Sequence, residues 1–266
     1  KVVEEWVSKK EAHVVYALAP GEYILHEEQA PTEQGYVRAE DVKFVVEETG
    51  DVQKVKMEDD HTKVSISKTD ITDGKEIEGA KLQILDQDGE VVESWTTGEE
   101  HLIEYLPVGT YTLHEEAAVD GYIVANDVEF TVEETGEIQK VKMEDERAMG
   151  QLVIVKTDTD SKAALEGVEF VLLEKETGKE VGRLKTGKDG KAVSELLPIG
   201  TYENGVFKEP ITYVLKETAT LKGYEKTEEE WEIVFTYQND KTPVIEVVKE
   251  IQNKKIPETP GTVKPG

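Results

Sequence analysis

The sequence predicts an all-β fold made of tandem β-sandwiches, and two observations lead to this prediction. The first is that apolar and polar residues alternate with a period of two in short runs, as at 64–68 and 128–132, which is typical of strands that bury one face. Turn sequences such as DQDGE at 86–90 and GKDGK at 187–191 separate the runs. Short strands between such turns are typical of a sandwich or barrel, and no segment shows the 3.6-residue period of an amphipathic helix.

The second observation is internal repetition, which makes the sandwiches tandem. VEETGDVQKVKMEDD at residues 46–60 recurs as VEETGEIQKVKMEDE at 132–146, and the three differences are conservative. YTLHEEAAVDGY at 111–122 has a more diverged counterpart, YVLKETATLKGY, at 213–224. Such self-similarity along a chain indicates a serial array of domains.

The repeats divide the chain into three copies, which suits its length of 266 residues. Copy one has no counterpart of TKVSISKTD at 62–70, which opens copy two. We therefore expect copy one to be the later part of a sandwich, without its first strands. The expected segments are copy one at residues 1–60, copy two at 61–147, copy three at 148–255 and a Pro-rich linker at 256–266.

Composition excludes several classes of function. The chain carries 31 Lys and Arg against 58 Asp and Glu, a formal net charge of -27, which repels nucleic-acid phosphates and anionic membranes. It contains no Cys, so disulfides, zinc–thiolate sites and thiol catalysis are excluded. No apolar run is long enough to span a bilayer. No signal peptide opens the sequence, so we expect a cytosolic chain, a mature secreted form or a fragment.

Polar and ionisable side chains occupy positions that the alternation assigns to the core. On three strands each of copies two and three, a Lys, a Glu and an Asp or Asn share the parity of the apolar residues. They are Lys68, Glu115 and Asp145 in copy two, and Lys156, Glu217 and Asn253 in copy three. Lys249 breaks the pattern of the last strand once. The alternative for each Lys taken alone is a side chain near a strand end that reaches solvent.

Three separately buried charges would not be tolerated, but a chemical reaction can remove them. Burial lowers the pKa of a Lys and raises the pKa of a Glu, which leaves a nucleophilic amine beside a protonated carboxyl. The amine can attack the side-chain carbonyl of Asp or Asn, with loss of water or ammonia respectively. The product is a neutral amide, an isopeptide bond, and fixed proximity supplies the effective concentration that the condensation needs.

Copies two and three resemble the collagen-adhesin B-type (Cna B, SpaA-like) domains of Gram-positive surface proteins and pilins. The resemblance rests on SKTD at 67–70 and VKTD at 155–158, on two segments that match the E-box, YTLHEEAAVDGY and YVLKETATLKGY, and on VKMEDE and EIQNKK in the last strands. It implies inverse-immunoglobulin-like sandwiches, each with an intramolecular isopeptide bond. The implied bonds are Lys68 to Asp145, with Glu115 as the catalytic residue, and Lys156 to Asn253, with Glu217.

The sequence departs from the family pattern in two respects. The E-box usually carries Ala-Pro before its Gly-Tyr, whereas copy two has Ala-Val at 118–119 and copy three has Thr-Leu at 220–221. Copy one keeps Glu27 and Asp59 but has no counterpart of Lys68. Its site is therefore incomplete, and we expect that copy one cannot cross-link itself.

The resemblance implies a structural stalk region of a Gram-positive cell-surface adhesin or pilus protein. The protein would be extracellular and anchored to the cell wall through a region outside this sequence. It would not be an enzyme beyond the single-turnover formation of its own bonds, and we expect no cofactor and no metal. The expected partners are neighbouring domains of the same surface protein and a host extracellular-matrix protein or glycan, with no nucleic acid and no membrane insertion.

Two alternative functions stay open. One is a ligand-binding adhesin domain for a host protein or glycan, which should show an exposed apolar or aromatic patch. The other is a split domain, in which a strand from another chain completes copy one. If that strand carried a Lys, Glu27 and Asp59 would be ready to form an intermolecular bond with it. The adjacent Glu115 and Glu116 do not indicate a glycosidase, because neighbouring strand residues point to opposite faces.

Overall fold

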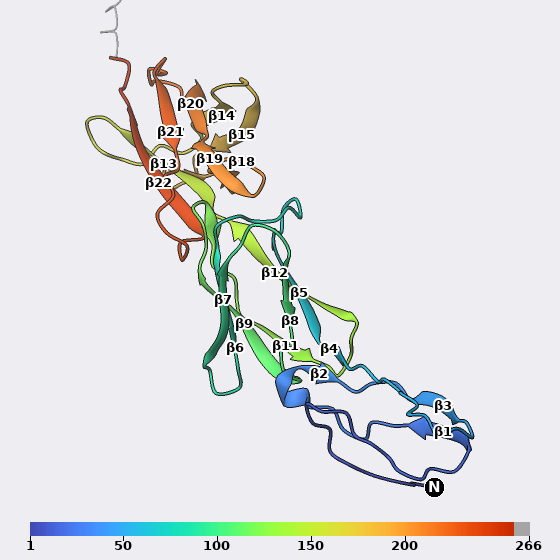
Figure 1. Ribbon diagram of the computed structural model, residues 1–266. Coiled ribbons are helices and arrows are strands. Elements are labelled where there is room, and N and C mark those ends of the chain that lie inside the picture. The colour runs from blue at the N-terminus through green and yellow to red at the C-terminus, as the bar shows by residue number, and fades with distance from the viewer. Residues whose placement is uncertain (258–266) are drawn as a thin grey trace, which may run out of the picture. The chain divides into compact units, whose positions relative to one another are not determined.

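The computed structural model describes residues 1–257, which form strands joined by turns and loops (Figure 1). Within this range the only helix is the single 3-10 turn η1 (Thr32–Gln34), and no helix there is long and apolar enough to cross a membrane. The prediction of an all-β protein is confirmed. Of the predicted linker at 256–266, all but residues 256 and 257 lie outside the described range.

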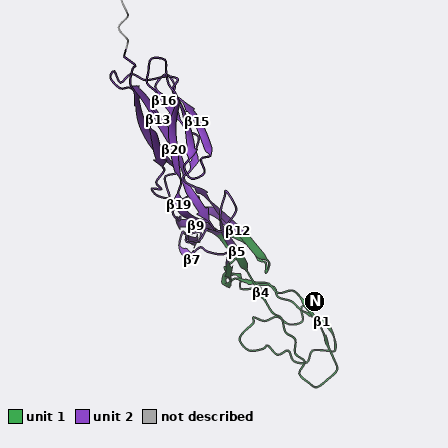
Figure 2. Cartoon of the chain, turned by 90° about the horizontal axis from the view of Figure 1, so that it is seen from above, with its two compact units in different colours: residues 1–65, 102–110, 131–140 green, residues 66–101, 111–130, 141–266 purple. Residues whose placement is uncertain are grey.

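The chain divides into two compact units (Figure 2). Copy one lies in unit one together with three segments of copy two, at 61–65, 102–110 and 131–140, and the candidate site residues of copies two and three lie in unit two. Unit one comprises residues 1–65, 102–110 and 131–140, and unit two comprises residues 66–101, 111–130 and 141–266.

Copy one forms two short antiparallel strand pairs instead of a whole sandwich. Strand β1 pairs with β3, and β2 pairs with β4. Residues 1–20 contain no strand. Among the described residues, copy one thus lacks the first strands that open copy two. The strands are β1 (Gly21–Leu25), β2 (Tyr36–Val37), β3 (Val42–Val46) and β4 (Asp60–His61).

The missing first strands decide the structure of the repeated segment QKVKMED. In copy two this segment lies in β12 (Ile138–Arg147), which is a neighbour of β5 (Lys63–Asp70) in its sheet. In copy one the same seven letters, at residues 53–59, lie outside any strand. Because the local sequence is identical, it is the neighbouring strand and not intrinsic propensity that makes this segment β-structure.

Copy two forms two four-stranded sheets, with the orders β10-β12-β5-β8 and β11-β9-β6-β7. The first strand β5 thus lies beside the last strand β12, and the E-box strand β9 belongs to the other sheet. The remaining strands are β6 (Lys81–Leu85), β7 (Val91–Thr96), β8 (His101–Glu104), β9 (Gly109–Ala117), β10 (Tyr122–Ile123) and β11 (Val128–Val132).

Copy three also forms two four-stranded sheets. In one, β13 pairs with β16, β17 and β22, and in the other the order is β15-β14-β20-β21. The last strand β22 runs parallel to the first strand β13, with Ile251 opposite Lys156 and Asn253 opposite Asp158. The strands are β13 (Met149–Asp158), β14 (Glu169–Glu174), β15 (Glu180–Lys185), β16 (Lys191–Val193), β17 (Leu197–Pro198), β18 (Gly200–Glu203), β19 (Val206–Pro210), β20 (Thr212–Ala219), β21 (Glu230–Val234) and β22 (Val244–Asn253).

The hairpin of β18 and β19 in copy three was not identified from the sequence. The two strands pair around Asn204 and Gly205, whose φ angles are 51° and 69°. Two consecutive residues with positive φ suit a type I′ turn, whose twist matches that of the flanking strands. The Asn-Gly pair is the sequence signal for this turn, so the hairpin could have been predicted.

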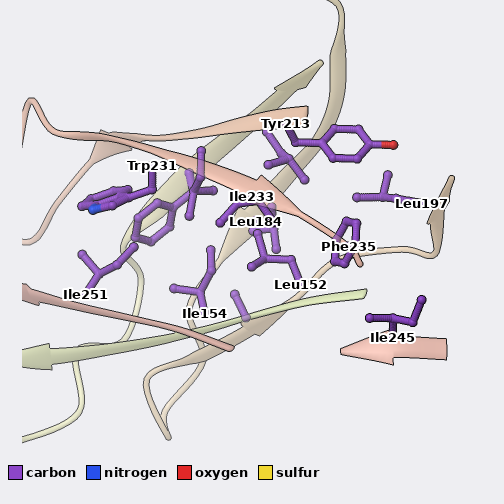
Figure 3. Packing of buried hydrophobic residues seen from close by; sticks show 14 of the residues in the cluster. Leu152, Ile154, Leu184, Leu197, Tyr213, Trp231, Ile233, Phe235, Ile245 and Ile251 are labelled. Atoms are coloured by element: carbon purple, nitrogen blue, oxygen red, sulfur yellow. The ribbon is translucent and has the colours of Figure 1, made fainter. Parts of the chain in front are cut away.

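The core of copy three is formed by the inward residues of both sheets (Figure 3). Leu152 and Ile154 of β13 and Ile251 of β22 belong to the same buried cluster as Trp231 of β21. Each large apolar side chain that is fully buried contributes about 1.5–3 kcal/mol. Lys249, which breaks the alternation, places its ammonium 5.8 Å from the centre of the Trp231 ring, so a cation–π contact accounts for its inward position.

Candidate isopeptide sites

In copy three the three predicted side chains meet inside the core. Lys156 Nζ lies 2.8 Å from Glu217 Oε2 and 2.6 Å from Asn253 Oδ1. Asn253 Nδ2 in turn donates a hydrogen bond to Glu217 Oε1 at 2.7 Å. None of the three residues is more than 4% exposed. The amine, the carboxyl and the amide therefore form a closed triangle that is shielded from solvent.

Copy two builds the same triangle with an Asp in place of the Asn. Lys68 Nζ lies 3.0 Å from Glu115 Oε2 and donates a hydrogen bond to Asp145 Oδ1. The backbone N–H of Ala125 donates to Glu115 Oε2 at 2.7 Å, which fixes the orientation of this carboxyl. All three side chains are buried, so this triangle is also shielded from solvent.

The fold brings these side chains together from both sheets. The Lys and the Asp or Asn stand on neighbouring strands of one sheet, β5 with β12 and β13 with β22. The Glu stands on the other sheet, where Glu115 is opposite Leu82 and Glu217 is opposite Phe170. Because all three keep the inward parity of their strands, they converge between the two sheets.

Burial shifts Asp145 and Lys156 toward their neutral forms. Desolvation raises the pKa of Asp145 to about 7, with Lys68 opposing the rise and Glu115 adding to it. Desolvation likewise lowers the pKa of Lys156, against the opposing effect of its hydrogen bond to Glu217. The side chains of Lys68 and Lys156 are 1% and 0% exposed, so neither Lys reaches solvent. These shifts favour a nucleophilic amine beside a carbonyl over a permanent ion pair.

Thr220 is a site residue that the sequence revealed only as a departure from the E-box pattern. Its Oγ1 accepts a hydrogen bond from Asn253 Nδ2 at 2.8 Å. This contact and the contact with Glu217 hold the amide nitrogen, and thereby turn Oδ1 toward the amine of Lys156. Copy two has Ala118 at the equivalent position, where Asp145 has no amide hydrogens to bind.

We expect the substitution Thr220→Val to slow bond formation in copy three without abolishing it. The Val keeps the shape but removes the acceptor, and a hydrogen bond of about 1 kcal/mol corresponds to about a fivefold slower reaction. The loss of ammonia is followed by mass spectrometry after refolding. Thr220→Ser should restore the rate, and the loss of water from copy two is the internal control. An unchanged rate in Thr220→Val would contradict a positioning role for Thr220.

Copy one does not assemble the site. Glu27 is half-buried and keeps one contact of its counterpart, because Glu27 Oε2 accepts from the Ala39 N–H at 2.8 Å. Asp59 is exposed and, within residues 1–257, forms no hydrogen bond or ion pair with Glu27. The strand that would carry Asp59 inward is the one that fails to form. The structure therefore does not bring these two predicted residues together.

Asp70 is a further buried carboxyl in copy two, at the end of β5. It accepts hydrogen bonds from Tyr122 Oη at 2.7 Å, Arg147 Nε at 2.6 Å and the Thr72 N–H at 2.7 Å. Burial by itself raises the pKa of Asp70, but these hydrogen bonds outweigh it and hold the pKa below its ordinary value. Asp70 thus ties the end of β5 to the Gly-Tyr segment and to the end of β12.

Arg147→Met is expected to destabilise the chain by about 1–3 kcal/mol, because it leaves the buried Asp70 carboxylate short of a partner. The pKa of Asp70 is lowered in the folded state, so the stability from its ionised form is present above the ordinary value of 3.8 and is lost as the pH falls through the lowered pKa. The difference between variant and native chain should therefore shrink in acid. Denaturant unfolding at a series of pH values measures it.

Arg183→Met is the matched control for this measurement. Arg183 pairs with Glu180 on the surface, where the two side chains are 69% and 43% exposed, and such pairs contribute little. We expect a change within about 0.5 kcal/mol at every pH. Equal effects of the two substitutions would contradict the assigned role of Asp70.

Metal binding finds no support in the part of the chain that the structure describes, where no group of His, Asp and Glu side chains is placed to hold a metal ion. His26 and His114, which lie at equal positions in copies one and two, instead contact the carboxylates of Asp41 and Asp127 at 2.6 and 2.7 Å. These pairs lie at the surface.

Comparison with known proteins gives a family and several similar structures. The SpaA family, a prealbumin-like fold domain, matches residues 1–61, 62–147 and 150–210. The TIE protein of Bacillus anthracis is 30% identical with a TM-score of 0.55, over 90% of this chain and 43% of that one. This chain thus spans less than half the length of the TIE protein. No curated protein matches the chain.

Two pilin structures are more distant. A streptococcal ancillary pilin is 19% identical with a TM-score of 0.33, over 91% of this chain and 77% of that one. The minor pilin GBS52 of Streptococcus agalactiae is 19% identical with a TM-score of 0.32, over 76% of this chain and 100% of that one.

Proposed function

Since the chain belongs to the family of SpaA domains with a prealbumin-like fold, we propose that it is a stalk segment of a Gram-positive cell-surface or pilus protein, locked by autocatalytic isopeptide bonds. The observation that carries this proposal is the buried triangle of copy three, with 2.6 Å between Lys156 Nζ and Asn253 Oδ1. The triangle of copy two supports it independently. Each triangle reacts once, so the chain is no enzyme with turnover.

The contacts of copy three supply a balanced reaction. The neutral amine of Lys156 attacks Cγ of Asn253, and a bond forms between Nζ and Cγ. Glu217 presents one carboxyl oxygen to each nitrogen, so it can take the proton that Nζ loses and deliver a proton to Nδ2. The bond between Cγ and Nδ2 then breaks, and ammonia leaves. In copy two the same steps join Lys68 to Asp145, with Glu115 as the proton carrier and water as the leaving group.

The proposed bonds suit a protein under tension. Because β13 and β22 are parallel neighbours, force applied to the two ends of copy three would pass along β13 to Lys156, across the bond, and out at Asn253. The residues between them would lie outside the load path, so the sandwich would not have to unzip. The chain has no Cys, so no disulfide can carry the load between its strands, and the isopeptide bonds would take that role. We therefore propose an extracellular stalk, with neighbouring domains of the same protein as its main partners.

The mass of the intact chain tests this function. Formation of both bonds expels one water and one ammonia from the chain. A mass that equals the sequence mass would contradict the proposal.

A second candidate function concerns copy one, where a lysine-bearing strand from outside residues 1–266 would complete the sandwich. A cavity of about 600 Å³ in unit one is lined mainly by charged and polar residues, together with Val37, Val42 and Met57. The counterpart of Met57 is Met143, which is buried in copy two. A segment without a strand partner beside such a cavity favours the addition of a strand.

A peptide with the sequence of residues 61–72 tests this second function, because it contains the first strand of copy two and its lysine. Mixed with the whole chain, it should form a covalent adduct at Asp59 that is lighter than the two components by one water. The chain with Asp59→Ala, and the peptide with Lys68→Arg, should form no adduct. The absence of an adduct from the unmodified pair would rule out completion by a strand of this type.

A further inference from the structure

The same small surface recurs at the end of all three copies. It consists of the Gly-Tyr pair that closes the E-box, the residue that pairs with this Tyr, and the residue after it, and we call it the end socket. In every socket the backbone N–H of the last residue donates to the Gly carbonyl, at 2.8 or 2.9 Å. The sockets are Gly35, Tyr36, His61 and Thr62 at the end of copy one, Gly121, Tyr122, Arg147 and Ala148 at the end of copy two, and Gly223, Tyr224, Lys255 and Ile256 at the end of copy three. The last one or two residues of each socket lie just beyond the bounds predicted for that copy.

The end socket of copy one holds an aromatic ring from copy two. The ring of Tyr105 stacks on His61 with 4.0 Å between the centroids, and it meets Tyr36 edge to face at 5.4 Å. A Cβ added to Gly35 would collide with the backbone of Tyr105. The Gly is therefore needed for the close approach of Tyr105, and Thr62 beneath the contact is fully buried.

The end socket of copy two holds an aromatic ring from copy three. The Tyr202 ring meets Tyr122 edge to face at 5.2 Å, and the guanidinium of Arg147 lies 4.1 Å from the Tyr202 ring centre. Tyr202 Oη donates a hydrogen bond to the Gly121 carbonyl at 2.8 Å. A Cβ on Gly121 would lie 2.8 Å from the ring of Phe207 in the adjacent hairpin, so the Gly again permits a close approach.

The end socket of copy three has the same backbone but holds no ring from residues 1–257. A Cβ added to Gly223 would meet nothing within 4 Å. Ile256 is 53% exposed, whereas its counterparts Thr62 and Ala148 are 0% and 1% exposed. The Lys255 ammonium lies 6.0 Å from the centre of the Tyr224 ring. Lys255 is exposed and Tyr224 is half-buried, and no described ring covers them as a ring covers the other two sockets.

We propose that the end socket of copy three is a docking surface for an aromatic side chain, presented by a further domain of the same family that follows in the same polypeptide. In both filled sockets the ring comes from the copy that follows along the chain. We therefore expect the ring for the third socket to come from a domain that follows copy three. A ring between Lys255 and Tyr224 would gain a cation–π and an edge-to-face contact, and it would cover Ile256. The inference rests on the repeated sockets and not on the isopeptide bonds.

The test extends the chain of residues 1–266 by a second copy of residues 62–147, so that copy three is followed by a domain that carries Tyr105. Hydroxyl-radical footprinting with mass spectrometry then reports the solvent access of Ile256. We expect the oxidation of Ile256 to fall severalfold relative to the unextended chain. Val193 is 54% exposed in copy three, which matches Ile256, and its oxidation should not change.

The control is the same extended chain with Tyr105→Ala in the appended domain, which should lose the protection of Ile256. Resistance to trypsin shows that the appended domain is folded in both versions. Unchanged oxidation of Ile256 beside a folded domain overturns the proposal, and protection that survives Tyr105→Ala overturns the role of the ring. N-acetyltyrosinamide added to the unextended chain is a second probe, independent of the appended domain. It should shift the backbone NMR resonances of Ile256 and leave those of Val193, and no shift at Ile256 would overturn the proposal.

Discussion

The purified chain is expected to be lighter than its sequence by one water and one ammonia. Glu115→Ala should restore only the water and Glu217→Ala only the ammonia, because each carboxyl contacts the reacting groups of one copy alone. The effect should be complete in each case, since removal of the proton carrier leaves a buried amine with no route for its proton. Electrospray mass spectrometry of the denatured chain measures both losses in one spectrum.

Glu116→Ala is the matched control for these variants. Glu116 follows Glu115 on the same strand but is exposed, so its removal takes away an equal charge without touching the site. Both mass losses should persist in this variant. If Glu115→Ala and Glu116→Ala showed the same mass losses, Glu115 would have no part in the formation of the bond.

Loss of the bond in copy three is expected to reduce the free energy of unfolding by about 4–5 kcal/mol, by analogy with a disulfide that closes a loop of this length. The two residues are 97 positions apart along the chain, so the bond restricts nearly the whole unfolded domain. The variant Lys156→Met with Glu217→Gln removes the bond and leaves no buried charge behind. Denaturant unfolding of this variant and of the native chain measures the difference.

Copy two should show an effect of similar size when Lys68 and Glu115 are replaced in the same way. Its loop spans 77 positions, and the entropic term changes only with the logarithm of loop length. Lys249→Met is the control, because it removes an inward Lys that makes a cation–π contact with Trp231, worth about 0.5–2 kcal/mol. If the double variant lost no more than this control, the proposed cross-link would not be what stabilises copy three.

The inward positions of the six candidate site residues could be predicted from the sequence, because strand parity is a local property. Lys68 and Asp145 lie far apart along the chain, yet the alternation of each strand alone assigns both to the core. Which strands are neighbours could not be predicted in this way. The pairing of β5 with β12 depends on the whole sheet, and only the family resemblance implied it.

Contacts that depend on a neighbour were the ones that the sequence analysis missed. Residues 53–59 and 139–145 have the same sequence, but only the second segment has a neighbouring first strand and forms β-structure. Thr220 could be identified as an exception to the E-box pattern. The role of its hydroxyl as a hydrogen-bond acceptor could not, because the donor, Asn253 Nδ2, lies on another strand. Local pattern therefore predicted burial, and tertiary pairing decided the contacts.

The parallel pairing of β13 and β22 has a consequence for survival among proteases. With the proposed bond in place, Lys156 and Asn253 would be joined by two covalent routes, one through the main chain and one through the side-chain amide. The polypeptide between them would be a closed ring. A protease that cut once in a surface turn, such as residues 187–191, would open the ring but leave the molecule in one piece. Each cross-linked copy would thus tolerate one cut within its ring, and the domains on either side of that copy would stay covalently connected.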